Sequence, residues 1–146
     1  MAEQTHHYET TVEWTAGRQG TVTAPGRPAI AIGVPPEFGG SDDTWSPEHL
    51  CAASVNACVM LTFAIIAGNS KVAFRAYSAT ATATLEKVEG AGTVVTRVAV
   101  SPRVTIGPEV DRAKIERLVK MAERNCYISN SLKATVTVEP EIVVAE

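Results

Sequence analysis

The segment SPEHLCAASVNACVML, residues 46–61, predicts the start of a long apolar helix. Its first three residues supply a hydroxyl N-cap, a proline at the first helical position and an acid near the positive end of the helix dipole. The apolar run continues to about Ala67, where a glycine and an asparagine favour the end of the helix. We therefore expect one uncharged helix at the centre of the fold.

The sequence on both sides of this helix has the alternating pattern of β-strands. Before the helix, we expect a hairpin and a third short strand at residues 6–14, 21–24 and 29–34. After it, we expect two long paired strands at residues 71–87 and 93–106, joined by the turn EGAG. Residues 134–144 predict a last strand, in which Pro140 indicates a sheet edge or a bulge.

A second helix is predicted to open at Pro108 and Glu109 and to end near Asn125. Its apolar face is expected to consist of Val110, Ala113, Leu118, Val119 and Ala122. The order of strands, helix, strands, helix and strand favours the α+β fold class. A chain of 146 residues suits one ordinary domain, so we expect a single domain over residues 1–146.

Charge and composition exclude some classes of partner. Lys and Arg total 13 against 16 Asp and Glu, which gives a net charge of -3 and no concentrated basic stripe for nucleic acid. Residues 1–11 are polar and lack the apolar run of a secretory signal, so we expect a cytoplasmic protein. The three cysteines are then expected to be thiols rather than structural disulfides.

A membrane-spanning interpretation has to be weighed because residues 50–67 carry no formal charge over 18 positions. Many of these positions are alanines, however, and Ser54, Asn56 and Thr62 interrupt the run. The rest of the chain has the pattern of a sheet protein. We therefore expect a helix buried in a globular core and no membrane partner.

Two cysteines, Cys51 and Cys58, lie in the apolar helix, and Cys126 follows the second helix. Seven residues correspond to about 700° of helical turn and roughly 10.5 Å of rise, so Cys51 and Cys58 share a face. Bridged cysteines have Cα atoms within about 7 Å, so any disulfide of either must reach Cys126. Alternatively, all three are small buried hydrophobic residues.

The sequence indicates no metal site. It has no Cys-x-x-Cys or Cys-x-x-His pair, and His6, His7 and His49 lack the spacing of metal ligands. His49 is expected to be a surface residue of the first helical turn.

Three motifs together resemble the OsmC/Ohr family of osmotically induced and organic hydroperoxide resistance proteins. They are GRQG at residues 17–20, SPEHLCAASVNAC at 46–58 and NCYISNSL at 125–132. The resemblance implies an OsmC-like fold, with antiparallel sheets around a long buried central helix. It also implies an intertwined homodimer with each active site at the subunit interface.

The resemblance assigns roles to four residues. Cys58 corresponds to the peroxidatic thiol and Cys126 to the resolving thiol, while Arg18 corresponds to the arginine that contacts the thiolate and Glu48 to the glutamate that holds that arginine. Many relatives have proline where Tyr127 follows the resolving cysteine. The chemistry is consistent with these roles, since a guanidinium about 4 Å from a thiolate contributes roughly 4 kcal/mol at an effective dielectric of about 20.

The expected activity is that of a thiol-dependent organic hydroperoxide reductase, an antioxidant enzyme of stress response. Cys58 would become a sulfenic acid and then form a disulfide with Cys126. No bound cofactor is expected, and the resemblance implies dihydrolipoamide, a lipoylated protein or another dithiol as reductant. Val55, Val59 and Phe63 are expected to favour a bulky organic hydroperoxide. The alternative is a non-catalytic dimer that binds a hydrophobic ligand or senses redox state.

Overall fold

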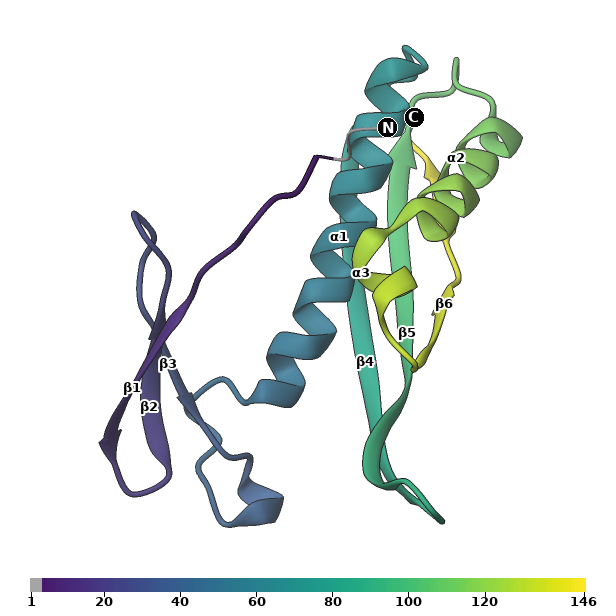
Figure 1. The fold of residues 1–146 in the computed structure, drawn as a ribbon. Coiled ribbons are helices and arrows are strands. Elements are labelled where there is room, and N and C mark those ends of the chain that lie inside the picture. The colour runs from purple at the N-terminus through teal and green to yellow at the C-terminus, as the bar shows by residue number, and fades with distance from the viewer. Residues whose placement is uncertain (1–3) are drawn as a thin grey trace. The chain divides into compact units, whose positions relative to one another are not determined.

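The computed structural model describes residues 4–146 and has the expected α+β architecture. The chain divides into two compact units, with the boundary between Leu50 and Cys51 (Figure 1). The first unit contains a three-stranded sheet, and the second contains a four-stranded sheet with most of the long helix.

Strands β1 (Thr11–Ala16), β2 (Gln19–Thr23) and β3 (Ile30–Gly33) form the antiparallel sheet of the first unit. The hairpin and third strand are therefore confirmed, although residues 6–10 lie outside the strands. In the register of this sheet, Val12 pairs with Val22 and Trp14 with Gly20, while Ile32 pairs with Gly20 and Ile30 with Val22. Alternation then places the apolar side chains of these pairs on one face.

A loop connects β3 to the long helix and is tied back to the sheet. It contains the short 3-10 helix η1 (Pro36–Phe38). At its far end, the Trp45 N–H donates to the Ala31 carbonyl at 3.2 Å, and the Gly33 N–H donates to the Trp45 carbonyl at 2.8 Å. These bonds hold residue 45 beside β3 and so fix where the helix begins.

Helix α1 (Pro47–Asn69) begins at the predicted position. The Ser46 hydroxyl accepts the His49 N–H at 3.2 Å and lies 2.7 Å from His49 Nδ1, so Ser46 acts as the N-cap. Buried residues recur every four positions as one stripe: Val55, Val59, Phe63 and Ala67. Outside that stripe Leu61 is 54% and Ile65 63% exposed. The central helix is thus buried along one stripe.

In length and apolar composition α1 also meets the criteria for a membrane-spanning helix. Those criteria are equally met by the core helices of soluble proteins. The buried stripe of α1 belongs to the hydrophobic core of the second unit.

The sheet of the second unit centres on β5 (Gly92–Ile106), which pairs antiparallel with β4 (Ala76–Val88). The chain returns through β6 (Thr135–Val138) and β7 (Glu141–Val144), and both pair parallel with β5. The single last strand predicted for residues 134–144 is therefore interrupted at Pro140, because proline has no N–H to donate to the ladder. Pro140 was expected to mark a sheet edge or a bulge within one strand, whereas the structure has two strands there, and their parallel pairing with β5 was not expected.

Helix α2 (Arg112–Asn125) begins later than predicted. The opening at Pro108 and Glu109 is wrong, because the Val110 N–H closes a turn onto Gly107 and the Asp111 carboxylate caps the helix through the Ala113 N–H at 3.1 Å. Its buried face is Ile115, Leu118, Val119 and Ala122, so Ile115 was missed and Ala113 is exposed. A further short helix, α3 (Tyr127–Ser131), follows and was not predicted.

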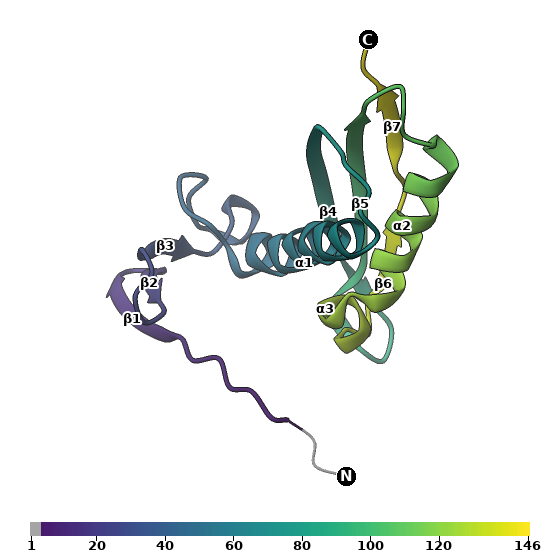
Figure 2. The same ribbon diagram turned by 90° about the horizontal axis from the view of Figure 1, so that it is seen from above.

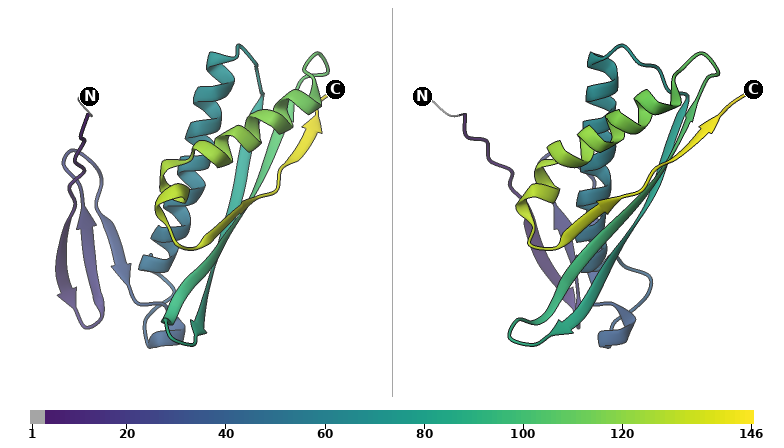
Figure 3. Two further views of the ribbon diagram at one scale, coloured as in Figure 1. Left: turned by 45° about the vertical axis from the view of Figure 1, so that its right-hand side comes forward. Right: turned by 90° about the vertical axis from the view of Figure 1, so that its right-hand side faces the viewer.

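The core of the second unit lies between its sheet and its helices. Alternate residues of β5 are fully buried on one face, and they pack in the same cluster as the buried stripes of α1 and α2. Both helices therefore cover one face of the sheet (Figures 2 and 3). Phe63 is central to this layer, with its ring centroid 5.1 Å from that of Phe74 and 5.6 Å from that of Tyr77.

Candidate active site: the Cys58 and Cys126 thiols

Cys58 lies on α1 beside the buried stripe and is half-buried, at the edge of the core. Its Sγ atom lies 3.9 Å from the hydroxyl oxygen of Thr62, one helical turn later. The helix therefore presents this sulfur at the border between the core and the open side of α1.

Cys126 lies at the junction of α2 and α3 and is fully buried. It is the last residue before α3, and its Sγ accepts the Ser129 N–H at 3.5 Å as the N-cap of that short helix. Two helix ends thus fix this sulfur in the core.

The structure brings these two thiols together. Burial acts to raise the pKa of Cys58, but hydrogen bonds from the Cys126 side chain, the Ile128 N–H, the Thr62 hydroxyl and the Tyr127 N–H outweigh it and lower that pKa. Burial raises the pKa of Cys126, and so does its hydrogen bond with Cys58. Cys58 is therefore favoured as the thiolate, and Cys126 as the thiol that donates to it.

Cys51 stands apart from this pair. It lies two helical turns before Cys58 on the same helix, is half-buried, and is a free thiol like the other two. Since α1 is an intact helix over this span, Cys51 and Cys58 are not placed for a disulfide. The predicted partner of a helix cysteine, Cys126, lies against Cys58.

Arg18 and Glu48, both in the first unit, are not joined as expected. Arg18 lies in the exposed turn between β1 and β2, and its Nη1 donates to the Phe38 carbonyl at 3.1 Å. Gly39 has a φ of 85°, and a Cβ there would collide with the guanidinium. Among the ion pairs of residues 4–146 there is none between Arg18 and Glu48, because the guanidinium is turned toward this loop instead.

Glu48 lies in the first turn of α1, as predicted, and is half-buried. Its Oε1 atom is buried and has no hydrogen-bond partner in the part of the chain that the structure describes. A buried carboxylate oxygen without a donor is costly, so this position calls for a donor from elsewhere.

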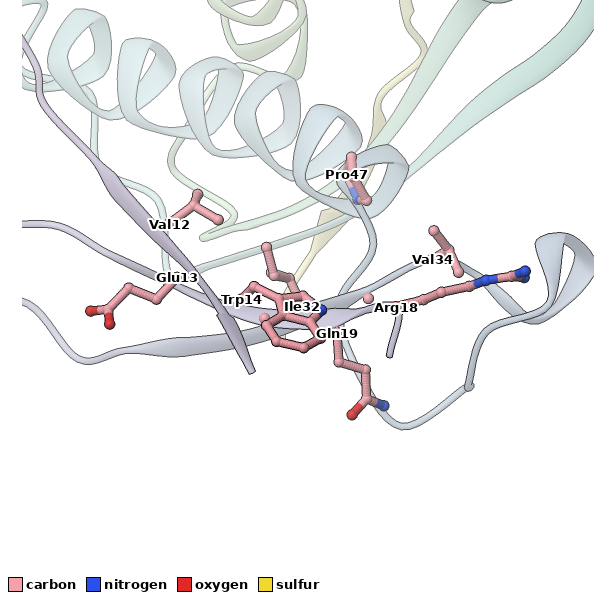
Figure 4. Close-up of a pocket in the computed structure, with 10 residues that line it drawn as sticks. Val12, Glu13, Trp14, Arg18, Gln19, Ile32, Val34 and Pro47 are labelled. Carbon is pink, nitrogen blue, oxygen red and sulfur yellow. The ribbon is translucent and has the colours of Figure 1, made fainter. Parts of the chain in front are cut away.

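An apolar pocket of about 260 Å³ lies on the sheet of the first unit, near Arg18 (Figure 4). Trp14, Ile32, Val34 and Pro47 supply its apolar surface. Trp14 is 75% exposed, and its indole N–H donates to the Gly17 carbonyl at 2.9 Å. The pocket is therefore open, and an exposed indole ring forms part of its lining.

The sequence profile of the family described as OsmC-like protein matches residues 40–141. The chain belongs to this family. It is 27% identical over 97 residues to the peroxiredoxin OsmC of Escherichia coli K12, a match that covers 66% of this chain and just under two thirds, 66%, of that relative.

Comparison with solved structures supports the OsmC-like fold. An OsmC-like protein of unknown function from Vibrio cholerae superposes with a TM-score of 0.87 at 23% identity, covering 94% of this chain and 100% of that one. An organic hydroperoxide resistance protein from Elizabethkingia anophelis superposes with a TM-score of 0.77 at 23% identity, covering 99% and 100%. At these identities the likeness concerns the fold alone.

The residues predicted as a substrate wall lie in the core of this OsmC-like protein. Val55, Val59 and Phe63 are 0%, 0% and 1% exposed. Each therefore has a packing role, and their contact with a substrate stays a prediction.

Sequence reasoning missed three donors beside Cys58: the Thr62 hydroxyl and the N–H groups of Tyr127 and Ile128. The spacing of four residues between Cys58 and Thr62 on a predicted helix was a usable signal. The two backbone donors had no such signal in the sequence, because their positions depend on the turn into α3.

Residues 4–146 contain no group of three or more His, Cys, Asp or Glu side chains able to hold a metal ion.

Proposed function

We propose that this protein is a thiol-dependent peroxidase that reduces organic hydroperoxides to alcohols. The observation that carries the proposal is the pair of free thiols in the core of the second unit, Cys58 on α1 and Cys126 at the α2–α3 junction, in which each thiol shifts the pKa of the other, lowering that of Cys58 and raising that of Cys126. Membership of the OsmC-like family and the names of its relatives, a peroxiredoxin and organic hydroperoxide resistance proteins, support the same reaction class.

In the first step the Cys58 thiolate attacks the outer oxygen of the hydroperoxide. The O–O bond breaks, the alkoxide leaves as an alcohol after taking a proton, and Cys58 becomes a sulfenic acid. The Cys126 sulfur then attacks the Cys58 sulfur and displaces hydroxide, which leaves as water with the proton of the Cys126 thiol. The products are one alcohol, one water and a disulfide.

An external dithiol closes the cycle by exchanging with the Cys58–Cys126 disulfide, which oxidises the dithiol and restores both protein thiols. We propose dihydrolipoamide, free or on a lipoylated protein, as this reductant. It acts as a co-substrate, and the protein holds no cofactor of its own. Three free thiols also support a reducing cytoplasmic location.

We assign Arg18 and Glu48 to the same site, completed in a homodimer with each active site at the subunit interface. In that arrangement the Arg18 guanidinium exchanges the Phe38 carbonyl for Glu48 and the Cys58 thiolate. The buried partnerless Oε1 of Glu48 and the exposed Leu61 and Ile65 of α1 support a missing partner surface.

We further propose that residues 1–146 act as one domain. The first unit is a small sheet whose apolar face leaves Val12 and Trp14 exposed, and this face is too small to form an independent core.

The residues packed next to Cys58 on the same helix are apolar: Val55, Val59 and Phe63. These apolar surroundings are more compatible with an alkyl hydroperoxide than with hydrogen peroxide.

The test starts from reduced protein mixed with a stoichiometric amount of cumene hydroperoxide or a fatty-acid hydroperoxide. Peptide mass spectrometry should then find a Cys58–Cys126 disulfide, and peroxide should continue to disappear when dihydrolipoamide is added. Cys58→Ser should abolish turnover, while Cys51→Ser, the matched control on the same helix, should retain it. Free thiols with intact peroxide would overturn the proposal.

A second candidate is a non-catalytic dimer that binds a hydrophobic ligand, and the open apolar pocket beside Trp14 favours it (Figure 4). A binding protein would keep its ligand affinity after Cys58→Ser. A redox sensor, the third possibility, would form the disulfide once but would not cycle with the dithiol.

A further inference from the structure

Thr62 is the one side chain of α1 that contacts the Cys58 sulfur through a hydroxyl. It lies four residues after Cys58, so the two side chains are neighbours on the helix surface. Its oxygen is 3.9 Å from Sγ, at the long end for a hydrogen bond to sulfur. A helical threonine can bond back to the carbonyl four residues earlier, but here the hydroxyl contacts the side chain of that residue.

The direction of this hydrogen bond depends on the state of Cys58. While the sulfur carries its proton, either atom can donate. Once Cys58 is a thiolate, its sulfur can only accept, so the hydroxyl must donate. A hydrogen bond to a charged acceptor is stronger and shorter than one to a neutral acceptor, so this contact is expected to tighten on deprotonation.

The other groups that face Cys58 come from a different part of the fold. They are the Cys126 thiol, which is the titratable group of the set, and the N–H groups of Tyr127 and Ile128, all at the α2–α3 junction. Thr62 is the donor from Cys58's own helix. It is also β-branched, so its side chain has few rotamers available in a helix. A stiff donor on the same rigid element can keep the sulfur in one orientation.

We propose that Thr62 is a positioning residue, whose hydroxyl donates to the Cys58 thiolate and holds the sulfur in the orientation for attack on a peroxide. The proposal deepens the proposed peroxidase function and rests on it for the attack, but the hydrogen bond itself is testable without any peroxide.

The experiment compares Thr62→Val, which keeps the shape and removes the hydroxyl, with Thr62→Ser, which keeps the hydroxyl. Thr82→Val, on an exposed position of β4, controls for the chemical change itself. Circular dichroism establishes that each variant is folded. The first readout is the pH profile of Cys58 alkylation by iodoacetamide, followed on its peptide by mass spectrometry.

Thr62→Val is expected to displace the alkylation profile to higher pH by about one unit, which slows alkylation near neutral pH about tenfold. Thr62→Ser and Thr82→Val should keep the profile of the unmodified protein. The second readout is a single-turnover reaction with cumene hydroperoxide, in which Thr62→Val should slow Cys58 oxidation by a similar factor and Thr62→Ser should restore it.

An unchanged profile in folded Thr62→Val, or a Thr62→Ser variant as slow as Thr62→Val, would overturn the inference. The two proposals fail separately. If the profile moves as expected but the unmodified protein does not react with peroxide, the hydrogen bond stands and the peroxidase function falls. If the protein turns over but Thr62→Val changes neither readout, the function stands and the role of Thr62 falls.

Discussion

At the scale of single residues, the two thiols of the site differ because their surroundings differ. Cys58 is half-buried and faces several donors, whereas Cys126 is fully buried, keeps its proton and donates a hydrogen bond to Cys58. As pH rises, Cys58 therefore ionises first, and over the interval up to the raised pKa of Cys126 the site holds one thiolate and one thiol. That is the combination that the proposed reaction requires.

The backbone N–H of Tyr127 allows a test of what lowers the pKa of Cys58 relative to that of Cys126. Cys126 is already extended, with φ -73° and ψ 113°, and Tyr127 is the first residue of α3, so a proline at 127 fits both neighbours. Tyr127→Pro would remove an N–H that favours the Cys58 thiolate. We expect the alkylation profile of Cys58 to move to higher pH.

Tyr127→Ala is the matched control, since it removes the exposed ring and retains the N–H. It should alkylate at the rate of the unmodified protein across the same pH range. If Tyr127→Pro and Tyr127→Ala behave alike, the backbone donor has no part in setting the reactivity of Cys58.

Among single residues, the sequence was most informative about the cysteines and least informative about the contacts of Arg18. Helix geometry excluded a bridge between Cys51 and Cys58 and left Cys126 as the possible partner of either, and the resemblance to the OsmC/Ohr family then selected Cys58. Arg18 could be named by resemblance, but its contact with Phe38 depends on how the loop after β3 folds back, which no local pattern records.

At the scale of elements, α1 shows how a helix that is apolar on all sides can still have a defined inner face. Its buried residues fall on one stripe because only that stripe meets the sheet and α2. The sequence predicted the extent of this helix from its caps. It did not predict the stripe, since apolar residues on every side leave no periodic signal.

Phe63 is the largest fully buried side chain on that stripe. Phe63→Ala should lower the free energy of unfolding by about 3–5 kcal/mol, through lost burial and an unfilled cavity next to Phe74 and Tyr77. Urea unfolding followed by circular dichroism measures it. Val88→Ala, at a residue 38% exposed, should cost less than about 1 kcal/mol, and equal costs at the two positions would contradict the packing described here.

Burial of Tyr77 on β4 makes the stability of the protein depend on pH. Burial raises its pKa from 10.0 to about 12, and its hydroxyl oxygen is buried without a hydrogen-bond partner among the described residues. The unfolded chain loses the phenol proton near pH 10 while the folded protein keeps it, so stability is fully present below pH 10 and falls as pH rises toward about 12.

Urea unfolding at a series of alkaline pH values would measure that fall. In Tyr77→Phe the decline over this interval should be smaller, because there is no buried phenol to ionise. The same variant should be at least as stable as the unmodified protein at neutral pH, since it removes a buried polar atom without a partner. A marked loss of stability at neutral pH would show that the hydroxyl has a partner after all.

At the scale of the whole molecule, surface chemistry differs between the two parts of the chain. Residues 1–50 contain seven acidic and two basic side chains, whereas residues 51–146 contain nine acidic and eleven basic ones. Opposite net charges favour pairing the first part of one copy with the second part of another. This supports an intertwined dimer over one that pairs like with like.

Leu61→Glu should weaken such a dimer, because it places a charge on the apolar side of α1, at a residue 54% exposed. Size-exclusion chromatography with light scattering should report twice 15.5 kDa for the unmodified protein and a shift toward 15.5 kDa for the variant. Val88→Glu, near the end of the β4–β5 hairpin, should leave the mass unchanged. A monomeric unmodified protein would refute the dimer.

The α+β class followed from the order of elements along the sequence, and that order could be predicted because turn-forming and helix-capping residues mark the ends of the elements. The parallel pairing of β6 and β7 with β5 could not be predicted, since strand direction depends on where α2 and α3 return the chain. Local patterns specify elements, whereas the route between them is a property of the complete fold.

That route also has a consequence for the time course of folding. The β4–β5 hairpin closes across a short turn, with Val88 paired to Gly92, whereas Arg97 pairs with Thr135 and Arg103 with Glu141, each 38 residues further on. Closing the longer loops costs more chain entropy before any contact is gained. The hairpin is thus expected to form early and β6 and β7 to dock late. Cys126 follows Cys58 by 68 residues, so the meeting of the two sulfurs also closes a long loop and is expected late in folding.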